Sequence, residues 1–127
     1  RLAERMEVPL AAGSSFDDRD AFRRALEGGA VRILRPDPLR LGGVTPLLKV
    51  AALAEAFHAS VVPYRLPELG VHLACGLPNV PMAEWGSWLA GAFAGPVVPR
   101  QGKLVPPDQP GHGLELNPDA VDRFRVP

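Results

Sequence analysis

Over the first ninety residues, short continuous apolar runs take turns with segments in which apolar residues are spaced among polar ones. Four short apolar runs have the length of buried strands: residues 8–13, 31–36, 60–64 and 80–84. The segments between these runs carry apolar residues three to four positions apart, which is the spacing of an amphipathic helix. Strands that alternate with helices pair in parallel and are buried on both faces. The pattern therefore predicts an α/β fold with about four parallel strands.

From about residue 91 the pattern changes. The stretch "GPVVPRQGKLVPPDQPGHGLEL" is rich in proline and glycine and follows neither a strand nor a helix period. Asn117, followed by Pro118 in the first turn, predicts one last short helix. We therefore divide the chain into an α/β part, residues 1–90, and an irregular closing segment, residues 91–127.

Composition and charge narrow the class of protein. The 127 residues are 46% hydrophobic, which suffices for the core of one domain. The 14 basic and 14 acidic residues are mixed along the chain, so we expect neither nucleic acid nor a membrane surface as a partner. The N-terminal sequence lacks a signal-peptide pattern, which favours a cytoplasmic location. The single cysteine, Cys75, excludes an internal disulfide, and we expect a buried, inert thiol.

Side chains with oxygen atoms follow all four predicted strands: Ser14, Asp37, Tyr64 and Glu84. In parallel α/β folds the carboxyl ends of the strands converge on one face, where ligands bind. Two carboxylates and a phenol gathered there are a plausible set for proton transfer. In the alternative interpretation, Asp37 caps the following loop, Tyr64 covers the mouth of a barrel and Glu84 is simply exposed. Spacing alone leaves both interpretations open.

Four segments then point to a known family. "PDPLRLGGVTPLLKVAALAEAF", "VVPYRLPELGVHLACGLPN", "MAEW" and "GKLVPPDQPGHGLEL", in this order, resemble the C-terminal part of the mandelate racemase/muconate lactonizing enzyme group of the enolase superfamily. The resemblance covers nearly the whole chain. It implies a modified (β/α)8 barrel with an N-terminal capping domain, and a bound Mg²⁺ ion. It also implies a base that abstracts the proton α to a substrate carboxylate, followed by racemisation, dehydration or cycloisomerisation.

The resemblance further implies a partial barrel. A complete one takes roughly 250 residues, whereas the four predicted strands match family strands five to eight. Residues 1–90 would then form half of a (β/α) barrel, and residues 91–127 would pack toward the capping domain. Two family metal ligands and the lysine base of many members belong to strands outside this sequence.

Residue by residue, the match to the family site is mixed. Ser14 occupies the position of a metal-binding glutamate, and a neutral hydroxyl is a poor ligand for Mg²⁺. Asp37 matches the aspartate of a His-Asp dyad, but Tyr64 takes the place of the histidine. A phenol is a much weaker base than an imidazole at neutral pH. Glu84 matches a glutamate that hydrogen-bonds the substrate carboxylate. The resemblance thus implies Asp37, Tyr64 and Glu84 as catalytic residues.

Two functions remain open at this point. The chain is either the C-terminal barrel part of an acid-sugar dehydratase or racemase-like enzyme, or a non-catalytic remnant or assembly module that keeps the fold. Asp37 and Glu84 favour the first function, whereas Ser14 and Tyr64 favour the second. For the chain alone we expect no activity and no bound Mg²⁺, with a carboxylate or sugar-acid substrate only in a completed barrel. Open strand edges also predict self-association.

Overall fold

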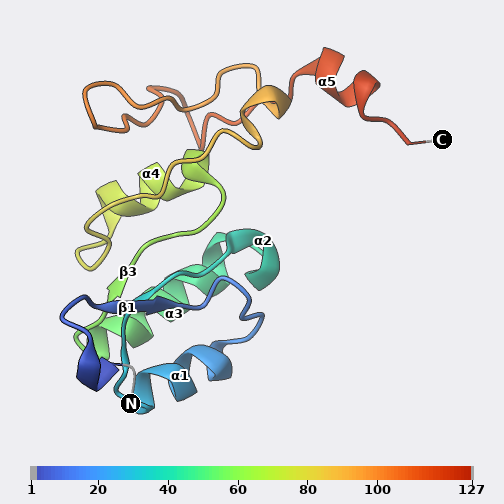
Figure 1. The fold of residues 1–127 in the computed structure, drawn as a ribbon. Helices are drawn as coiled ribbons and strands as arrows, with labels where there is room; N and C mark the ends of the chain where they lie inside the picture. Colours follow the sequence, from blue (N-terminus) through green and yellow to red (C-terminus); the bar gives the residue numbers. More distant parts are fainter. Residues whose placement is uncertain (1–2, 127) are drawn as a thin grey trace.

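A three-stranded parallel sheet lies at the centre of the α/β part (Figure 1). The computed structural model describes residues 3–126. The strands are β1 (Leu10–Ala12), β2 (Val31–Leu34) and β3 (Ser60–Val61), in the order β1-β2-β3. The α-helices are α1 (Arg19–Glu27), α2 (Pro38–Leu41), α3 (Val44–Ala56), α4 (Pro67–Gly76) and α5 (Pro118–Arg123). Two short 3₁₀-helices are η1 (Ala3–Arg5) and η2 (Ala90–Ala92).

Both strand pairs are parallel and follow the order of the sequence, as the pattern predicted. Ala12 lies opposite Leu34 on β2, and Leu34 in turn lies opposite Val61 on β3. Prolines limit the strands to a few residues: Pro9 precedes β1, Pro36 follows β2 and Pro63 follows β3. A proline cannot donate a backbone hydrogen bond to a neighbouring strand. The first three strands therefore form where they were predicted, but each is shorter than predicted.

The predicted fourth strand, residues 80–84, is wrong: within residues 3–126 the sheet has three strands. The chain does return beside β3, where the Val61 amide donates to the Asn79 carbonyl at 2.8 Å. Val80 is also buried in the core. Pro78 and Pro81 flank this point, and both lack the amide that would extend the pairing. The fourth position of the barrel is thus occupied by an extended segment without a strand ladder.

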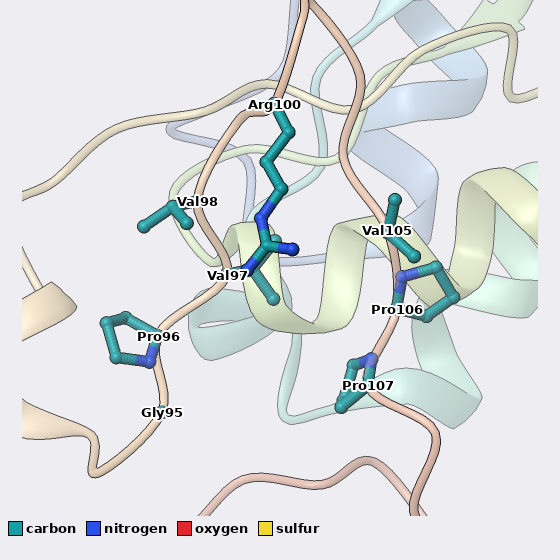
Figure 2. Close-up of a pocket in the computed structure, with 8 residues that line it drawn as sticks. All are labelled: Gly95, Pro96, Val97, Val98, Arg100, Val105, Pro106 and Pro107. Carbon is teal, nitrogen blue, oxygen red and sulfur yellow. The ribbon is translucent and has the colours of Figure 1, made fainter.

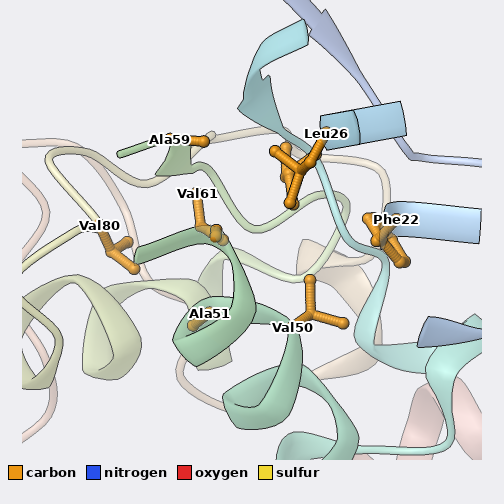
Figure 3. Packing of buried hydrophobic residues seen from close by; sticks show 9 residues of the cluster. Phe22, Leu26, Val50, Ala51, Ala59, Val61 and Val80 are labelled. Carbon is orange, nitrogen blue, oxygen red and sulfur yellow. The ribbon is translucent and has the colours of Figure 1, made fainter. Parts of the chain in front are cut away.

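The core lies where α1 and α3 cover the sheet (Figure 3). Phe22 of α1, Val50 of α3 and Val61 of β3 are all fully buried. Burying a side chain of this size stabilises the fold by about 1.5–3 kcal/mol. These contacts fix α1 and α3 against the sheet and leave the carboxyl ends of the strands free to carry the site.

The closing segment is irregular, as predicted, and continues away from the sheet on the far side of α4 (Figure 1). A single antiparallel bridge joins Phe93 to Leu116, next to η2, and Asn117 caps α5 through the Asp119 amide. The prediction for Cys75 is wrong: its side chain is exposed, because it lies in the last turn of α4 beyond the packed face. None of the helices in residues 3–126 is long and apolar enough to cross a membrane.

Candidate functional site

The exits of β2 and β3 run side by side beyond the regular strands. The Val62 amide donates to the Leu34 carbonyl at 2.8 Å, and the Tyr64 amide donates to the Pro36 carbonyl at 2.9 Å. These two bonds continue the parallel pairing past the prolines. They hold Tyr64 next to the segment that carries Asp37, as expected for neighbouring strand ends.

Asp37 is a buried carboxylate, with 1% of its surface exposed. It is the N-cap of α2, and its Oδ1 accepts a hydrogen bond from the Leu39 amide at 2.9 Å. Asp37 therefore caps the segment that follows it, as the alternative interpretation predicted, but that segment is a short helix and not a loop. Sequence reasoning missed the helix α2 itself, although an aspartate followed by proline is a typical start of a helix.

The second oxygen of Asp37 faces an arginine. Arg65 Nε lies 3.0 Å from Asp37 Oδ2, in an ion pair whose Nε–H is not aligned well enough to count as a hydrogen bond. The Arg65 side chain is 41% exposed, so one part of it is held on a buried anion while the rest reaches solvent. A buried carboxylate needs such a partner, since an isolated buried charge is strongly unfavourable.

Two arginines surround Tyr64. The guanidinium carbons of Arg35 and Arg65 lie 4.7 and 5.4 Å from the centre of the Tyr64 ring, within the range of cation–π attraction. Arg35 also donates to Glu84 Oε2 and forms an ion pair with that partly buried carboxylate. We call these five residues the strand-exit cluster: Arg35, Asp37, Tyr64, Arg65 and Glu84.

The strand-exit cluster brings Asp37, Tyr64 and Glu84 into one network, although the three do not contact one another through a hydrogen bond between their side chains. The two arginines make the connections. Because two guanidinium groups meet two carboxylates, the formal charges of the cluster cancel. Sequence reasoning missed both arginines, although Arg35 and Arg65 stand within two residues of Asp37 and Tyr64, respectively.

Ser14 follows β1 and makes no hydrogen bond to the strand-exit cluster within the described part of the chain. Ser14 follows Gly13, which has φ +120° and leaves no room for a Cβ beside Phe22.

The side chains at the strand exits do not fit Mg²⁺. No group of three or more acidic, histidine or cysteine side chains is placed to hold a metal within residues 3–126. Asp37 and Glu84 already face guanidinium groups, and Ser14 is neutral.

One hollow adjoins the strand-exit cluster, and another lies in the closing segment. A cavity of about 120 Å³ is lined by Tyr64, Arg65 and Trp88, beside the strand-exit cluster. A larger one, of about 290 Å³, lies in the closing segment between two proline- and valine-rich arms (Figure 2). Arg100 extends between these arms in Figure 2. The larger hollow has no acidic residue or histidine in its lining, so it is the smaller one that adjoins candidate chemistry.

Comparison with known proteins assigns the family. Residues 1–120 match the family described as enolase C-terminal domain-like. The chain belongs to this family. Among its solved relatives, L-talarate dehydratase from Polaromonas sp. JS666, complexed with Mg and L-glucarate, superposes with a TM-score of 0.88. That protein is 34% identical, and the match covers 98% of this chain and 35% of the other. The family assignment confirms the resemblance to the mandelate racemase/muconate lactonizing enzyme group.

Two curated relatives match the chain over nearly its whole length. A 3,6-anhydro-α-L-galactonate cycloisomerase from Streptomyces coelicolor is 31% identical over 99% of this chain and 35% of its own length. A D-galactarolactone cycloisomerase from Agrobacterium fabrum is 30% identical over 100% of this chain and 38% of its own length. The chain thus spans about a third of the length of these relatives. The partial (β/α)8 barrel predicted from the sequence is confirmed as a fold class, with three strands.

Proposed function

We propose that this chain forms the C-terminal barrel part of an acid-sugar dehydratase or cycloisomerase, and that its strand-exit cluster acts on the substrate. The observation that carries the proposal is the convergence of Asp37, Tyr64 and Glu84 at one end of the sheet, linked by two arginines. Relatives with dehydratase and cycloisomerase names support the substrate class. In this proposal the rest of the barrel comes from a longer polypeptide.

Tyr64 is the proton donor in the proposed mechanism. Asp37 and Glu84 each face an arginine, so both carboxylates already have a partner within the protein. Tyr64 has no such ion pair, and its side chain lines the small cavity. When a base elsewhere in the barrel removes the proton α to the carboxylate, the electron pair moves into the carboxylate group and gives an enediolate. The pair then forms the Cα–Cβ double bond as the bond between Cβ and its hydroxyl breaks. The hydroxyl leaves as water with the Tyr64 proton, and the Tyr64 phenolate recovers a proton from solvent.

The other members of the strand-exit cluster hold Tyr64 in place. Asp37 acts through Arg65 and Glu84 acts through Arg35, and both guanidinium groups lie over the Tyr64 ring. Fixing the ring in this way limits its rotation and holds the hydroxyl at one point, which favours an aligned proton transfer. Since the residues present do not fit Mg²⁺, no step of this mechanism involves a metal held by this chain.

The test uses the full-length polypeptide and D-galactonate as substrate. Replacing Tyr64 by phenylalanine should lower kcat for dehydration at least about 100-fold, the usual size of a lost general acid. Thr45→Val, which removes an exposed hydroxyl from α3, is the matched control and should leave the rate unchanged. A 3-fluoro analogue, whose fluoride leaves without a proton, should react at similar rates with Y64F and parent. An unchanged rate of Y64F with D-galactonate would disprove the role of Tyr64.

A second candidate function is a non-catalytic member of the family. It is favoured by Ser14 at the family ligand position and by the pairing of both carboxylates with arginines. The double variant Ser14→Glu, Tyr64→His in the full-length polypeptide separates the two functions. If the parent is inactive on acid sugars and the double variant is active, the chemistry has been lost by substitution and the second function holds.

A further inference from the structure

Arg65 has a donor edge that no described residue uses. Its Nε is buried against Asp37 Oδ2 at 3.0 Å, but the side chain as a whole is 41% exposed. Within residues 3–126 the Nη atoms form none of the side-chain hydrogen bonds, and they are absent from the buried, unpartnered atoms. They are therefore open to solvent. A guanidinium held through Nε presents its two Nη groups as a flat fork, the geometry that binds a carboxylate with two parallel hydrogen bonds.

The backbone also holds Arg65 in an unusual conformation. Its φ is +77°, and the Leu66 amide donates to the Tyr64 carbonyl at 3.0 Å across it. A hydrogen bond between residues two apart around a positive φ is a γ-turn, which is strained in a residue other than glycine. This turn directs the side chain toward the buried Asp37. Asp37 is itself fixed by the Leu39 amide, so the guanidinium has a rigid support.

Arg65 also lines a cavity large enough for a carboxylate group. The hollow of about 120 Å³ is lined by Tyr64, Arg65 and Trp88. Trp88 closes one side of it, and its Nε1–H donates to the Arg65 carbonyl at 3.1 Å. A single water needs only about 10–15 Å³ of such volume, so a carboxylate and the adjoining carbon atoms can enter. The cavity thus combines a cation, an aromatic face and a side chain whose fluorescence reports on occupancy.

We propose that Arg65 binds a carboxylate of the acid-sugar substrate, with the bound group in the cavity beside Trp88. This assignment rests on the proposed function only for the choice of acid sugars as ligands. Asp37 partly neutralises Arg65, and the Arg65 side chain is 41% exposed, so the attraction is modest. Binding to this chain alone should therefore saturate in the millimolar range. A sugar acid with carboxylates should bind, and a polyol of the same carbon skeleton should not.

The experiment is a fluorescence titration of this chain with galactarate at constant ionic strength. The Trp85→Phe background leaves Trp88 as the only tryptophan. We expect a saturable change with galactarate and none with galactitol. Arg65→Ala should raise the dissociation constant at least tenfold. Arg65→Lys should also weaken binding severalfold, because it keeps the charge but lacks the planar fork. Arg32→Ala removes an exposed arginine of β2 and should have no effect.

Three results would overturn the assignment: no saturable change with galactarate, equal binding of galactitol, or equal weakening by R32A and R65A. If R65A fails to fold, as judged by circular dichroism, the titrations of R65K and of the parent still decide whether Arg65 binds galactarate. The outcome is separate from that of the proposed function. Binding through Arg65 without dehydration by the full-length polypeptide would leave the binding site standing and disprove the enzyme. Dehydration with a KM for galactarate unchanged in R65A would support the enzyme and disprove the binding site at Arg65.

Discussion

Gly13 is the position where one added methyl group should be most harmful. It has φ +120°, and a Cβ built there would lie 2.5 Å from Cε1 of Phe22. Phe22 is fully buried in the core, so its ring has little space to move away. Overpacking of this kind costs about 1–3 kcal/mol, and a strained positive φ costs a similar amount. Gly13→Ala should thus lower the free energy of unfolding by about 2–6 kcal/mol.

The chain supplies a matched control at Gly29. Its φ is +69°, but no atom lies within 4 Å of the position of an added Cβ. Gly29→Ala should therefore cost only the backbone strain, about 1–2 kcal/mol. Urea unfolding followed by circular dichroism measures both variants. In a Phe22→Leu background the smaller side chain should reduce the cost of Gly13→Ala by at least about 1 kcal/mol. If Gly13→Ala costs no more than Gly29→Ala, the reasoning from the Phe22 contact is refuted.

Three further predictions concern the cap, the metal and the state of association. Asp37→Ala should destabilise the chain by about 1–3 kcal/mol in urea unfolding, and Asp37→Asn by about 1 kcal/mol less, because asparagine still accepts from the Leu39 amide; equal costs would contradict the capping role. Calorimetry should detect no saturable Mg²⁺ binding to this chain alone, since Ser14 replaces a carboxylate; micromolar binding would contradict this. Light scattering at tens of micromolar protein should give a mass above the monomer, because β1 pairs on one side only; a monomer would count against an open barrel.

The arrangement of the sheet could be predicted because the strand signals are local. Apolar runs separated by helical segments indicated parallel strands in sequence order, and β1, β2 and β3 follow that order. The prediction of a fourth strand was wrong because strand pairing depends on backbone amides. Pro78 and Pro81 lack these amides and flank the hydrogen bond from Val61 to Asn79. The pattern of apolar residues in a sequence does not show which backbone amides will form hydrogen bonds with a neighbouring strand.

The site could be predicted only in part. The convergence of strand ends predicted that Asp37 and Tyr64 lie close together, because parallel topology requires it. Glu84 joins them through Arg35, although the strand predicted before it does not form. The ion pairs of Asp37 and Glu84 could not be foreseen. An arginine has a long side chain, and whether it points to solvent or folds back depends on tertiary contacts. The strained turn at Arg65 is likewise invisible in the sequence, since nothing in the residue type favours a positive φ there.

Hydrogen exchange at the carbon α to the carboxylate is the most direct test of the proposed chemistry. The full-length polypeptide is incubated with D-galactonate in deuterated water, and deuterium at C2 is followed by NMR. We expect the parent to dehydrate the acid. Tyr64→Phe should still incorporate deuterium at C2 while dehydration is lost, because Tyr64 protonates the leaving hydroxyl. Absence of both deuterium incorporation and dehydration in the parent, across sugar acids of this class, would disprove the proposed dehydratase chemistry.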